Sequence, residues 1–190
     1  MVQEIEIEFK NLLTKPEFDR ILNRLPFPEK ADKQTNFYFE TMDFSLRKNK
    51  SALRIRQKNG NYRLTLKEPH PDGLLETHDH LTVEEANEWL NGNCIPKENI
   101  LKQLNQINVS LQDLKYFGSL TTERREYKDN GIIYVLDYST YNNQEDYELE
   151  IEAIHKKEGI QAFHSLLEEL HIPQRETANK IQRFFSTLKK

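Results

Sequence analysis

Residues 51–68 read SALRIRQKNGNYRLTLKE, and they predict two antiparallel strands joined by a tight turn. The turn falls at Asn59-Gly60, because Asn-Gly between two alternating segments is the strongest short-range signal for a two-residue hairpin. Apolar and charged residues alternate on both sides of this turn, and successive side chains of a strand point to opposite faces. The hairpin therefore has one apolar face and one ionic face, and the ionic face carries Arg54, Arg56, Lys58, Arg63, Thr65 and Lys67.

The same two-residue period continues through much of the chain. Asn130-Gly131 marks the turn of a second predicted hairpin. With the first hairpin included, we expect eight strands, at about 2–10, 34–41, 51–58, 61–68, 74–81, 119–128, 131–139 and 146–154.

Helical spacing of apolar residues predicts helices between these strands. Pro16 can occupy the first turn of one helix, and Thr82 with Glu85 forms a capping-box pattern at the start of another. We expect further helices near 97–106, 158–171 and 176–188, the last two separated by Ile172-Pro173.

Eight antiparallel strands with short hairpins and no long parallel crossover indicate a closed or nearly closed barrel. The expected fold class is therefore α+β, an eight-stranded antiparallel β-barrel with flanking helices. The chain of 190 residues is long enough for one sizeable core and contains no internal linker, so we expect a single domain over residues 1–190.

Composition excludes several classes of protein. The single Cys94 excludes an intramolecular disulfide and a cysteine metal cage, and it fits a reducing compartment. The first ten residues lack the pattern of a secretory signal, and no run of about 18 apolar residues predicts a membrane span. The net charge of −4 argues against a general nucleic-acid binder. We expect a cytoplasmic protein without a membrane partner, and no pattern fixes its oligomeric state.

Two further strands carry acidic faces, with Glu4, Glu6, Glu8 and Lys10 on one and Glu148, Glu150 and Glu152 on the other. These could be ordinary half-buried strands whose charged faces meet water. Two observations favour ionic faces that point into the barrel instead. Glu is a poor strand residue and three on one face repel one another, whereas a solvated face usually mixes signs. The acidic strands also lie at the ends of the strand series, and the basic strands lie in its middle.

Inward ionic faces would give the barrel an acidic wall and a basic wall. Mg²⁺ and similar hard cations bind oxygen ligands, often one or two carboxylates together with phosphate oxygens of a substrate. Arg and Lys bind the remaining phosphate oxygens. The two walls together therefore indicate a site for a divalent metal and a polyphosphate.

The same residues resemble the CYTH family, also called the triphosphate tunnel metalloenzymes. The opening motif ExExK matches Glu6-Ile7-Glu8-Phe9-Lys10. The other matching segments follow in family order: Asn36-Phe37-Tyr38-Phe39, Ala52-Leu53-Arg54-Ile55-Arg56, Leu64-Thr65-Leu66-Lys67, Thr122-Glu123-Arg124, Leu136-Asp137, Tyr147-Glu148-Leu149-Glu150-Ile151-Glu152, and Lys180 with Arg183. The resemblance covers nearly the whole chain and is greatest to short bacterial members with a single domain.

The resemblance implies an eight-stranded triphosphate tunnel, dependence on Mg²⁺ or Mn²⁺, and a ligand such as tripolyphosphate, ATP or thiamine triphosphate. The implied metal ligands are Glu6, Glu8, Asp137, Glu150 and Glu152. The implied phosphate ligands are Lys10, Arg54, Arg56, Arg63, Lys67, Arg124, Lys180 and Arg183. Of these residues, Glu6, Glu8, Lys10 and Asp137 would serve catalysis directly.

Some assignments have alternatives. Arg124 is preferred to Arg125 because the strand alternation points Arg124 inward. Arg183 could instead pair with Glu176 across two helical turns, or place a cation at the helix end.

Five other side chains have less certain roles by position. Glu4 and Glu148 would lie near the rim of the barrel, which makes them weaker candidates for metal ligands. Glu76 could point inward as a carboxylate ligand or serve as the partner of an Arg. His78 and His80 share one strand face and could bind metal, although no third ligand has suitable spacing.

Three functions fit this site. The preferred one is metal-dependent hydrolysis of a triphosphate. The second is an adenylate cyclase, which converts ATP to cyclic AMP and pyrophosphate and needs the same ions with the ligand in a different register. The third is a polyphosphate or nucleotide sensor that binds without turnover. Hydrolysis is preferred because the sequence shows no pocket for a nucleotide base.

Overall fold

The computed structural model describes residues 3–188, and the nine strands in this range form one sheet in the order β1-β6-β5-β4-β3-β7-β8-β9-β2. The strands are β1 (Gln3–Glu6), β2 (Glu8–Leu13), β3 (Asp32–Thr41), β4 (Ala52–Lys58), β5 (Asn61–His70), β6 (Gly73–Leu81), β7 (Leu114–Asp129), β8 (Ile132–Tyr141) and β9 (Gln144–Ala153). The strand pairs whose register is described are antiparallel. The α+β class is therefore confirmed, while closure of the sheet into a barrel stays a prediction.

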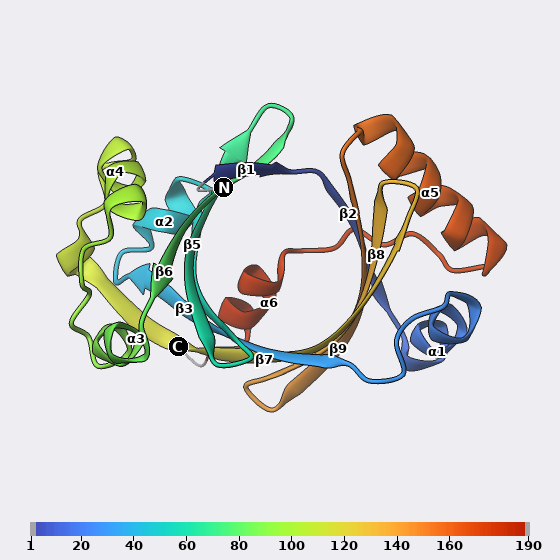
Figure 1. Cartoon of the computed structure of the whole chain (residues 1–190), viewed down its shortest axis with the longest axis horizontal. Coiled ribbons are helices and arrows are strands. Elements are labelled where there is room, and N and C mark those ends of the chain that lie inside the picture. Colours follow the sequence, from blue (N-terminus) through green and yellow to red (C-terminus); the bar gives the residue numbers. More distant parts are fainter. Residues whose placement is uncertain (1–2, 189–190) are drawn as a thin grey trace. The chain divides into compact units, whose positions relative to one another are not determined.

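Helices occupy the spans between strands (Figure 1). They are α1 (Lys15–Arg24), α2 (Ser45–Lys48), α3 (Val83–Leu90), α4 (Glu98–Gln106), α5 (Lys156–Glu169) and α6 (Lys180–Ser186), with a 3₁₀ helix, η1, at Leu111–Asp113. No helix in the described range is both long and apolar enough to cross a membrane.

The chain folds into two compact units. The first unit comprises Met1–Ile5 and Gln34–Leu120, and the second comprises Glu6–Lys33 and Thr121–Lys190. The single domain expected over residues 1–190 stays a prediction.

Both Asn-Gly hairpins are confirmed. Asn59 and Gly60 have φ angles of 52° and 78°, and Asn130 and Gly131 have 47° and 80°, so all four residues adopt the left-handed conformation of a type I′ turn. A third turn of this kind, Asn142-Asn143, joins β8 to β9 with φ angles of 45° and 59°. The sequence analysis did not identify it, although Asn tolerates positive φ better than most residues.

The strand expected at 2–10 is two strands, because the chain changes its pairing partner at Ile7. β1 neighbours β6 in the sheet order, whereas β2 pairs with β9, with Glu8 opposite Glu152. The expectation of eight strands was therefore wrong by one. A break of this kind depends on distant strands and has no local sequence signal.

The helix predictions are confirmed at α1, α3, α4 and α5, and the capping box of Thr82 and Glu85 is present at α3. The last helix is shorter than predicted: it begins at Lys180, so Glu176 lies outside it. The short α2 was not predicted. Its N-terminus is capped by the buried carboxylate of Glu40 on β3, which accepts hydrogen bonds from the N–H groups of Leu46 and Arg47 at 2.9 Å each.

The core of the first unit lies on the apolar face of β4 and β5. Leu53 and Leu64 are fully buried there against Trp89 of α3 and Leu104 of α4. The Trp89 indole N–H donates to the Ile95 carbonyl at 3.1 Å, which satisfies its polar atom inside an apolar cluster.

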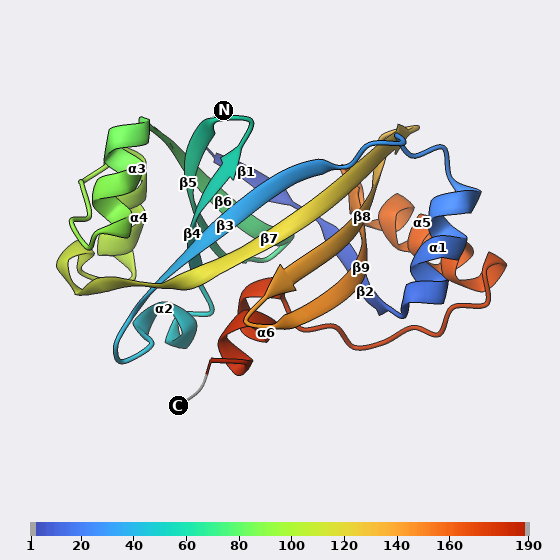
Figure 2. The same cartoon turned by 90° about the horizontal axis from the view of Figure 1, so that it is seen from below.

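The second unit repeats this plan with α1 and α5. Leu149 and Ile151 of β9 pack with Ile21 of α1 and with Phe163 and Leu166 of α5. Figures 1 and 2 both draw α1 and α5 beside β9. The expected packing of apolar strand faces beneath helices is therefore confirmed in each unit, and the opposite faces are left to the charged residues.

Gly159 of α5 lies where the helix crosses β2 and β9. A Cβ atom placed on Gly159 would lie 2.7 Å from Phe9 Cε2 and 2.8 Å from Ala153 Cβ. In an open helix, replacing Gly by Ala stabilises by roughly 1 kcal/mol. Here we expect Gly159→Ala to lower the free energy of unfolding by about 1–3 kcal/mol, because overpacking outweighs propensity. Urea unfolding measures this effect, with the exposed Gln161→Ala on the same helix as the control. A stabilised Gly159→Ala protein would contradict the close packing.

Candidate functional site

Four strands of the second unit place charged side chains on one face of the sheet. The strand registers set Arg124 of β7 opposite Asp137 of β8, and Asp137 opposite Glu148 of β9. Glu150 of β9 is opposite Lys10 of β2. These residues lie on the face of the strands away from the apolar core, because they alternate with Leu136, Leu149 and Ile151.

Arg124 is the central cation of this face. Its guanidinium donates to both Asp137 oxygens, at 2.8 and 2.6 Å, and to Glu150 Oε2 at 2.6 Å. Burial alone would lower the pKa of Arg124, but the two carboxylates raise that pKa well above its ordinary value. The preference for Arg124 over Arg125 as the inward residue is confirmed, because Arg125 reaches the Glu29 carbonyl instead.

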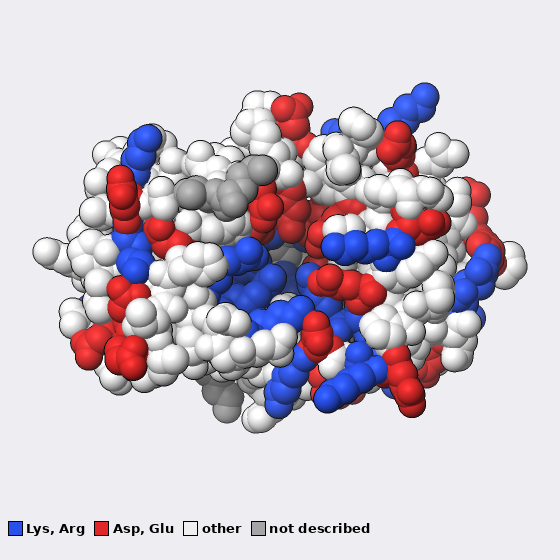
Figure 3. Space-filling view, in the orientation of Figure 1, with Lys and Arg blue, Asp and Glu red and all other residues white. Residues whose placement is uncertain are grey.

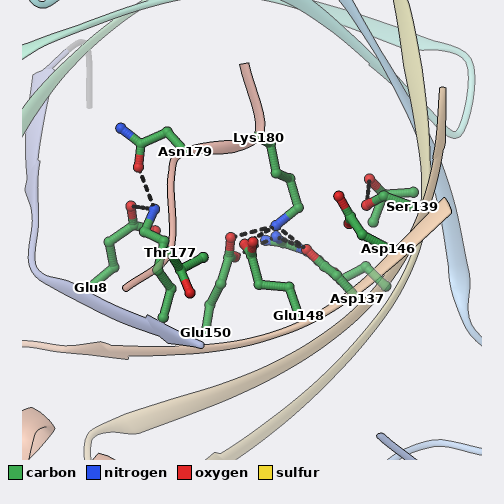
Figure 4. A network of polar contacts seen from close by, with 12 residues as sticks. Glu8, Asp137, Ser139, Asp146, Glu148, Glu150, Thr177, Asn179 and Lys180 are labelled. Carbon is green, nitrogen blue, oxygen red and sulfur yellow. Dashed lines mark hydrogen bonds and ion pairs between the residues drawn. The ribbon is translucent and has the colours of Figure 1, made fainter. Parts of the chain in front are cut away.

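Lys180, the first residue of α6, contacts the same carboxylates from the other side (Figure 4). Its Nζ lies 2.9 Å from Asp137 Oδ2 and 2.6 Å from Glu150 Oε1, and it also pairs with Glu148. Burial again acts against the charge, but the three carboxylates hold the pKa of Lys180 well above its ordinary value. Two buried cations therefore share the same acidic partners.

Arg183, one turn further along α6, pairs with β9 and not with Glu176. Its Nε lies 2.8 Å from Asp146 Oδ2, and its Nη1 lies 2.5 Å from Glu148 Oε2. The alternative of a surface pair with Glu176 is therefore wrong, because Glu176 precedes the helix. The sequence analysis missed Asp146, although it occupies the next even position of the strand that carries Glu148 and Glu150.

Five carboxylates of the second unit lie close enough to shift the pKa values of their neighbours, and we call them the acidic corner: Glu6, Glu8, Glu148, Glu150 and Glu152. Burial raises the pKa of Glu152, and the neighbouring charges of Glu150, Glu6 and Glu8 raise it as well. Arg124 opposes the shift, and the resulting pKa is about 7. Burial likewise raises the pKa of Glu148 to about 7, although Lys180 opposes the shift. The rim position expected for Glu148 was wrong, because its side chain is fully buried. Carboxylate oxygens are the donors that hard divalent cations prefer, so these residues match Mg²⁺ or Mn²⁺ in donor type.

Lys10 borders this corner on β2. It pairs with Glu8 and donates to Asn179 Oδ1 at 2.8 Å (Figure 4). Asn179, which the sequence analysis did not select, precedes Lys180 and forms the N-cap of α6. Lys10 is therefore hydrogen-bonded to the residue that directly precedes Lys180.

The ionic face of the first unit carries the other predicted phosphate ligands. Arg56 of β4 is opposite Arg63 of β5 and donates to Asn36 Oδ1 at 3.1 Å. Arg54 and Lys67 lie on the same two strands. Figure 3 shows Lys and Arg atoms gathered beside the region where Figure 1 draws β5, on the side away from α3 and α4.

Glu76 of β6 is the acidic partner in this basic face. It pairs with Lys67, and Arg54 Nη2 lies 3.7 Å from its Oε1. Burial would raise the pKa of Glu76, but Arg54 and Lys67 lower it to about 2. Of the two roles left open by the sequence, the contacts favour that of a partner for cations.

His78 lies next to Glu76, and its Nδ1 lies 3.0 Å from the Thr65 hydroxyl. Its Nε2 lies 3.0 Å from Glu4 Oε1 and 3.4 Å from Glu76 Oε2. Ligand atoms of Glu4, Glu76 and His78 lie within 4.8 Å of one another, which is close enough to hold a metal ion. In this group His78 lies beside two carboxylates. A metal site shared by His78 and His80 stays a prediction.

The predicted site residues thus fall into two sets. The second unit brings together Glu8, Lys10, Arg124, Asp137, Glu150, Glu152, Lys180 and Arg183, with Glu6 close enough to raise the pKa of Glu152. The first unit carries Arg54, Arg56, Arg63 and Lys67. Their roles as metal, phosphate or catalytic ligands stay predictions.

The raised pKa of Glu152 predicts that metal-free protein loses stability as pH rises. The pKa is 4.5 for an ordinary Glu and about 7 in the folded protein. Between these values the folded state binds more protons than the unfolded state, so the free energy of unfolding falls with increasing pH. Glu152→Gln removes this titration, and we expect the stability of the variant relative to wild type to increase from about pH 5 to about pH 7.

Urea unfolding in the presence of a chelator measures this difference. The exposed Glu123→Gln on β7 is the matched control, because Glu123 precedes Arg124 and its side chain therefore points to the opposite face of the strand. A Glu152→Gln difference that is constant across the pH range would contradict the burial and repulsion at Glu152.

Known proteins similar to this chain place it in a family. Residues 4–185 match the family described as CYTH domain. A Bacillus subtilis protein named "Putative triphosphatase YjbK" is 49% identical over 191 residues, which cover 100% of this chain and 99% of that protein.

Two solved structures are also similar. One, described as a "putative adenylate cyclase" from Bacillus halodurans, has a TM-score of 0.93 and 41% identity, and covers 97% of this chain and 100% of its own. The other, HpAC1 from Hippeastrum, has a TM-score of 0.77 and 25% identity over 96% of each chain, and is described as a "putative adenylyl cyclase" with "a dominant triphophatase activity". The match over residues 4–185 and the 49% identity show that this chain belongs to the CYTH domain family.

Proposed function

We propose that this chain is a divalent-metal-dependent triphosphatase. The observation that carries the proposal is the acidic corner of the second unit, where Glu150 pairs with buried Arg124 and Lys180, and Glu152 Oε1 lies 3.9 Å from Arg124 Nη1. Membership of the CYTH family, the name of the Bacillus subtilis relative and the dominant triphosphatase activity described for HpAC1 support the same activity. The reaction adds water to a terminal phosphorus and breaks the bond to the bridging oxygen.

Glu6, Glu8, Glu150 and Glu152 would hold the metal ion in this proposal. When bound, the ion would neutralise phosphate charge and polarise a phosphoryl oxygen. Asp137 is fully buried and already accepts from Arg124 and lies 2.9 Å from Lys180. These contacts favour a role for Asp137 in positioning the two cations, while its role as a metal ligand stays a prediction.

The cations of the second unit would bind phosphate oxygens. Arg124 is held by its two hydrogen bonds to Asp137, so its remaining donors are fixed in direction before a ligand arrives. Fixed donors aimed at developing negative charge need no reorganisation during the reaction and stabilise its transition state. Lys10 and Lys180 add two point charges, and Arg54, Arg56, Arg63 and Lys67 of the first unit stay predicted phosphate ligands.

Purified protein with Mg²⁺ or Mn²⁺ and tripolyphosphate, ATP or thiamine triphosphate tests the activity directly. We expect orthophosphate release that stops when the metal is chelated. Cyclic AMP with pyrophosphate would instead support the adenylate cyclase. Tight binding of all three compounds without turnover would support a sensor and contradict hydrolysis.

Substitutions within the acidic corner test the site. We expect Glu150→Gln and Glu152→Gln each to lower kcat/KM by about 100-fold or more, because each removes a negative charge that would hold the metal ion. Arg56→Ala tests the predicted phosphate ligands of the first unit in the same assay. The exposed Glu123→Gln keeps full activity as the control. Unchanged kinetics in both Glu150→Gln and Glu152→Gln would show that the charged face is only a solvated surface.

A further inference from the structure

Residues 173–179, which we call the strap, lie between α5 and α6 and contact strand β2 (Figure 2). β2 stands at one end of the strand order in the described residues. The strap contains no helix or strand, so contacts of individual side chains fix its course. One of these is the Thr177 hydroxyl, which accepts from the Leu12 N–H at 2.9 Å.

Asn11 of β2 connects to the strap through both ends of its side-chain amide. Its Nδ2 donates to the Pro173 carbonyl at 3.2 Å, and its Oδ1 accepts from the Arg175 N–H at 2.6 Å. The Asn11 side chain is fully buried, so these hydrogen bonds have little competition from water. Asn11 therefore fixes the backbone of the strap on both sides of Gln174.

Arg175 adds the charged part of the attachment. Its guanidinium donates to Glu17 Oε2 at 2.8 Å, to Glu17 Oε1 at 2.9 Å and to the Leu12 carbonyl at 2.9 Å. The same Glu17 accepts from the Thr14 N–H at 2.7 Å as part of the capping box of α1. Arg175 thus joins the strap, β2 and the start of α1 with one planar group, a geometry that Lys cannot reproduce.

The strap leads directly to the buried cation of the acidic face. Asn179 accepts from Lys10, and Lys180 follows with its ion pairs to Asp137, Glu148 and Glu150 (Figure 4). The α6 helix has only seven residues, which is too short to be stable without tertiary contacts. The position of Lys180 therefore depends on how the strap is held.

We propose that Arg175 is a positioning residue that holds Lys180 against the carboxylates of the second unit. Clamped by Asn11, Leu12 and Glu17, the strap presents Lys180 with its side chain only 11% exposed. The kinetic consequence rests on the proposed function, in which Lys180 binds a phosphate oxygen. Arg175 itself belongs to the strap, and its described contacts are with Asn11, Leu12, Glu17 and Thr177, not with the carboxylates that bind Lys180.

Chemical reactivity of Lys180 tests the proposal without any enzyme assay. Brief acylation of folded protein with an amine-reactive ester, followed by peptide mass spectrometry, measures how often each lysine amine is accessible. We expect Arg175→Ala to raise the acylation rate of Lys180 by about tenfold or more, because the strap opens more often. Lys15, whose side chain is 55% exposed, serves as the internal reference and keeps its rate.

Arg24→Ala is the matched control variant. Arg24 pairs with Glu169 between α1 and α5, so its loss removes an Arg–Glu pair in the same unit without touching the strap. We expect Lys180 to stay protected in Arg24→Ala. Glu17→Gln keeps the hydrogen bond to Thr14 but loses the charge facing Arg175, and it replaces Arg175→Ala if that variant does not fold. If Lys180 is acylated at the wild-type rate in folded Arg175→Ala or Glu17→Gln protein, the proposal is overturned.

Kinetics then connect the strap to activity. We expect Arg175→Ala to lower kcat/KM for tripolyphosphate by about 100-fold, since a misplaced catalytic group costs this much even when the mutation is remote. Arg175→Lys should fall between wild type and Arg175→Ala. Because both changes act through one group, Arg175→Ala combined with Lys180→Ala should be no less active than Lys180→Ala alone. Effects that multiply would overturn the proposal.

The two proposals fail in distinguishable ways. A wild-type protein that hydrolyses no triphosphate refutes the proposed function, while acylation of Lys180 still decides the role of Arg175. A melting temperature lowered equally in Arg175→Ala and Arg24→Ala, with Lys180 protected in both, would assign Arg175 a purely structural role.

Discussion

The ion pairs around Glu150 hold two cations and three carboxylates where little water reaches. Arg124 and Lys180 both bind Glu150 and Asp137, and Lys180 also binds Glu148. Removing one partner of such a network costs about 3–5 kcal/mol, whereas replacing the whole network by apolar residues is often neutral or stabilising. A fold alone would gain nothing from this arrangement. Its presence is therefore better explained by the charges it keeps fixed for a ligand.

The charged face of each unit also holds a few residues of the opposite charge. Among the carboxylates of the second unit, Arg124 and Lys180 are the fixed cations, and in the basic face of the first unit Glu76 is the fixed anion. The balance in the second unit is incomplete, since Glu148 and Glu152 keep pKa values near 7. A bound cation would relieve this repulsion, which is why we propose the metal ion at these carboxylates.

Features with local causes could be predicted from the sequence. Two-residue alternation located the strands and pointed Arg124 inward, and Asn59-Gly60 required only the positive φ angles of its own turn. Features with distant causes could not be predicted. The break at Ile7 follows from pairing with β6 and then β9, and Glu40 caps α2 from the end of β3. For the same reason the sequence offered Arg183 a helical neighbour, Glu176, as an alternative partner, although its ion pairs are with β9.

The strap shows how protection of a strand edge and placement of a proposed phosphate ligand can be one structural problem. An exposed edge of a sheet invites pairing with other chains, and proteins cover such edges with loops or side chains. Here Thr177 binds the N–H group of Leu12 on β2, and Arg175 binds the Leu12 carbonyl and the Asn11 side chain. The same two strap residues fix the start of α6. Asn11 and Arg175 are separated by 164 positions, so no local pattern could pair them. Covering the edge with an irregular segment also leaves Lys180 dependent on a few hydrogen bonds. Any movement that frees the edge must therefore withdraw a cation from Glu150.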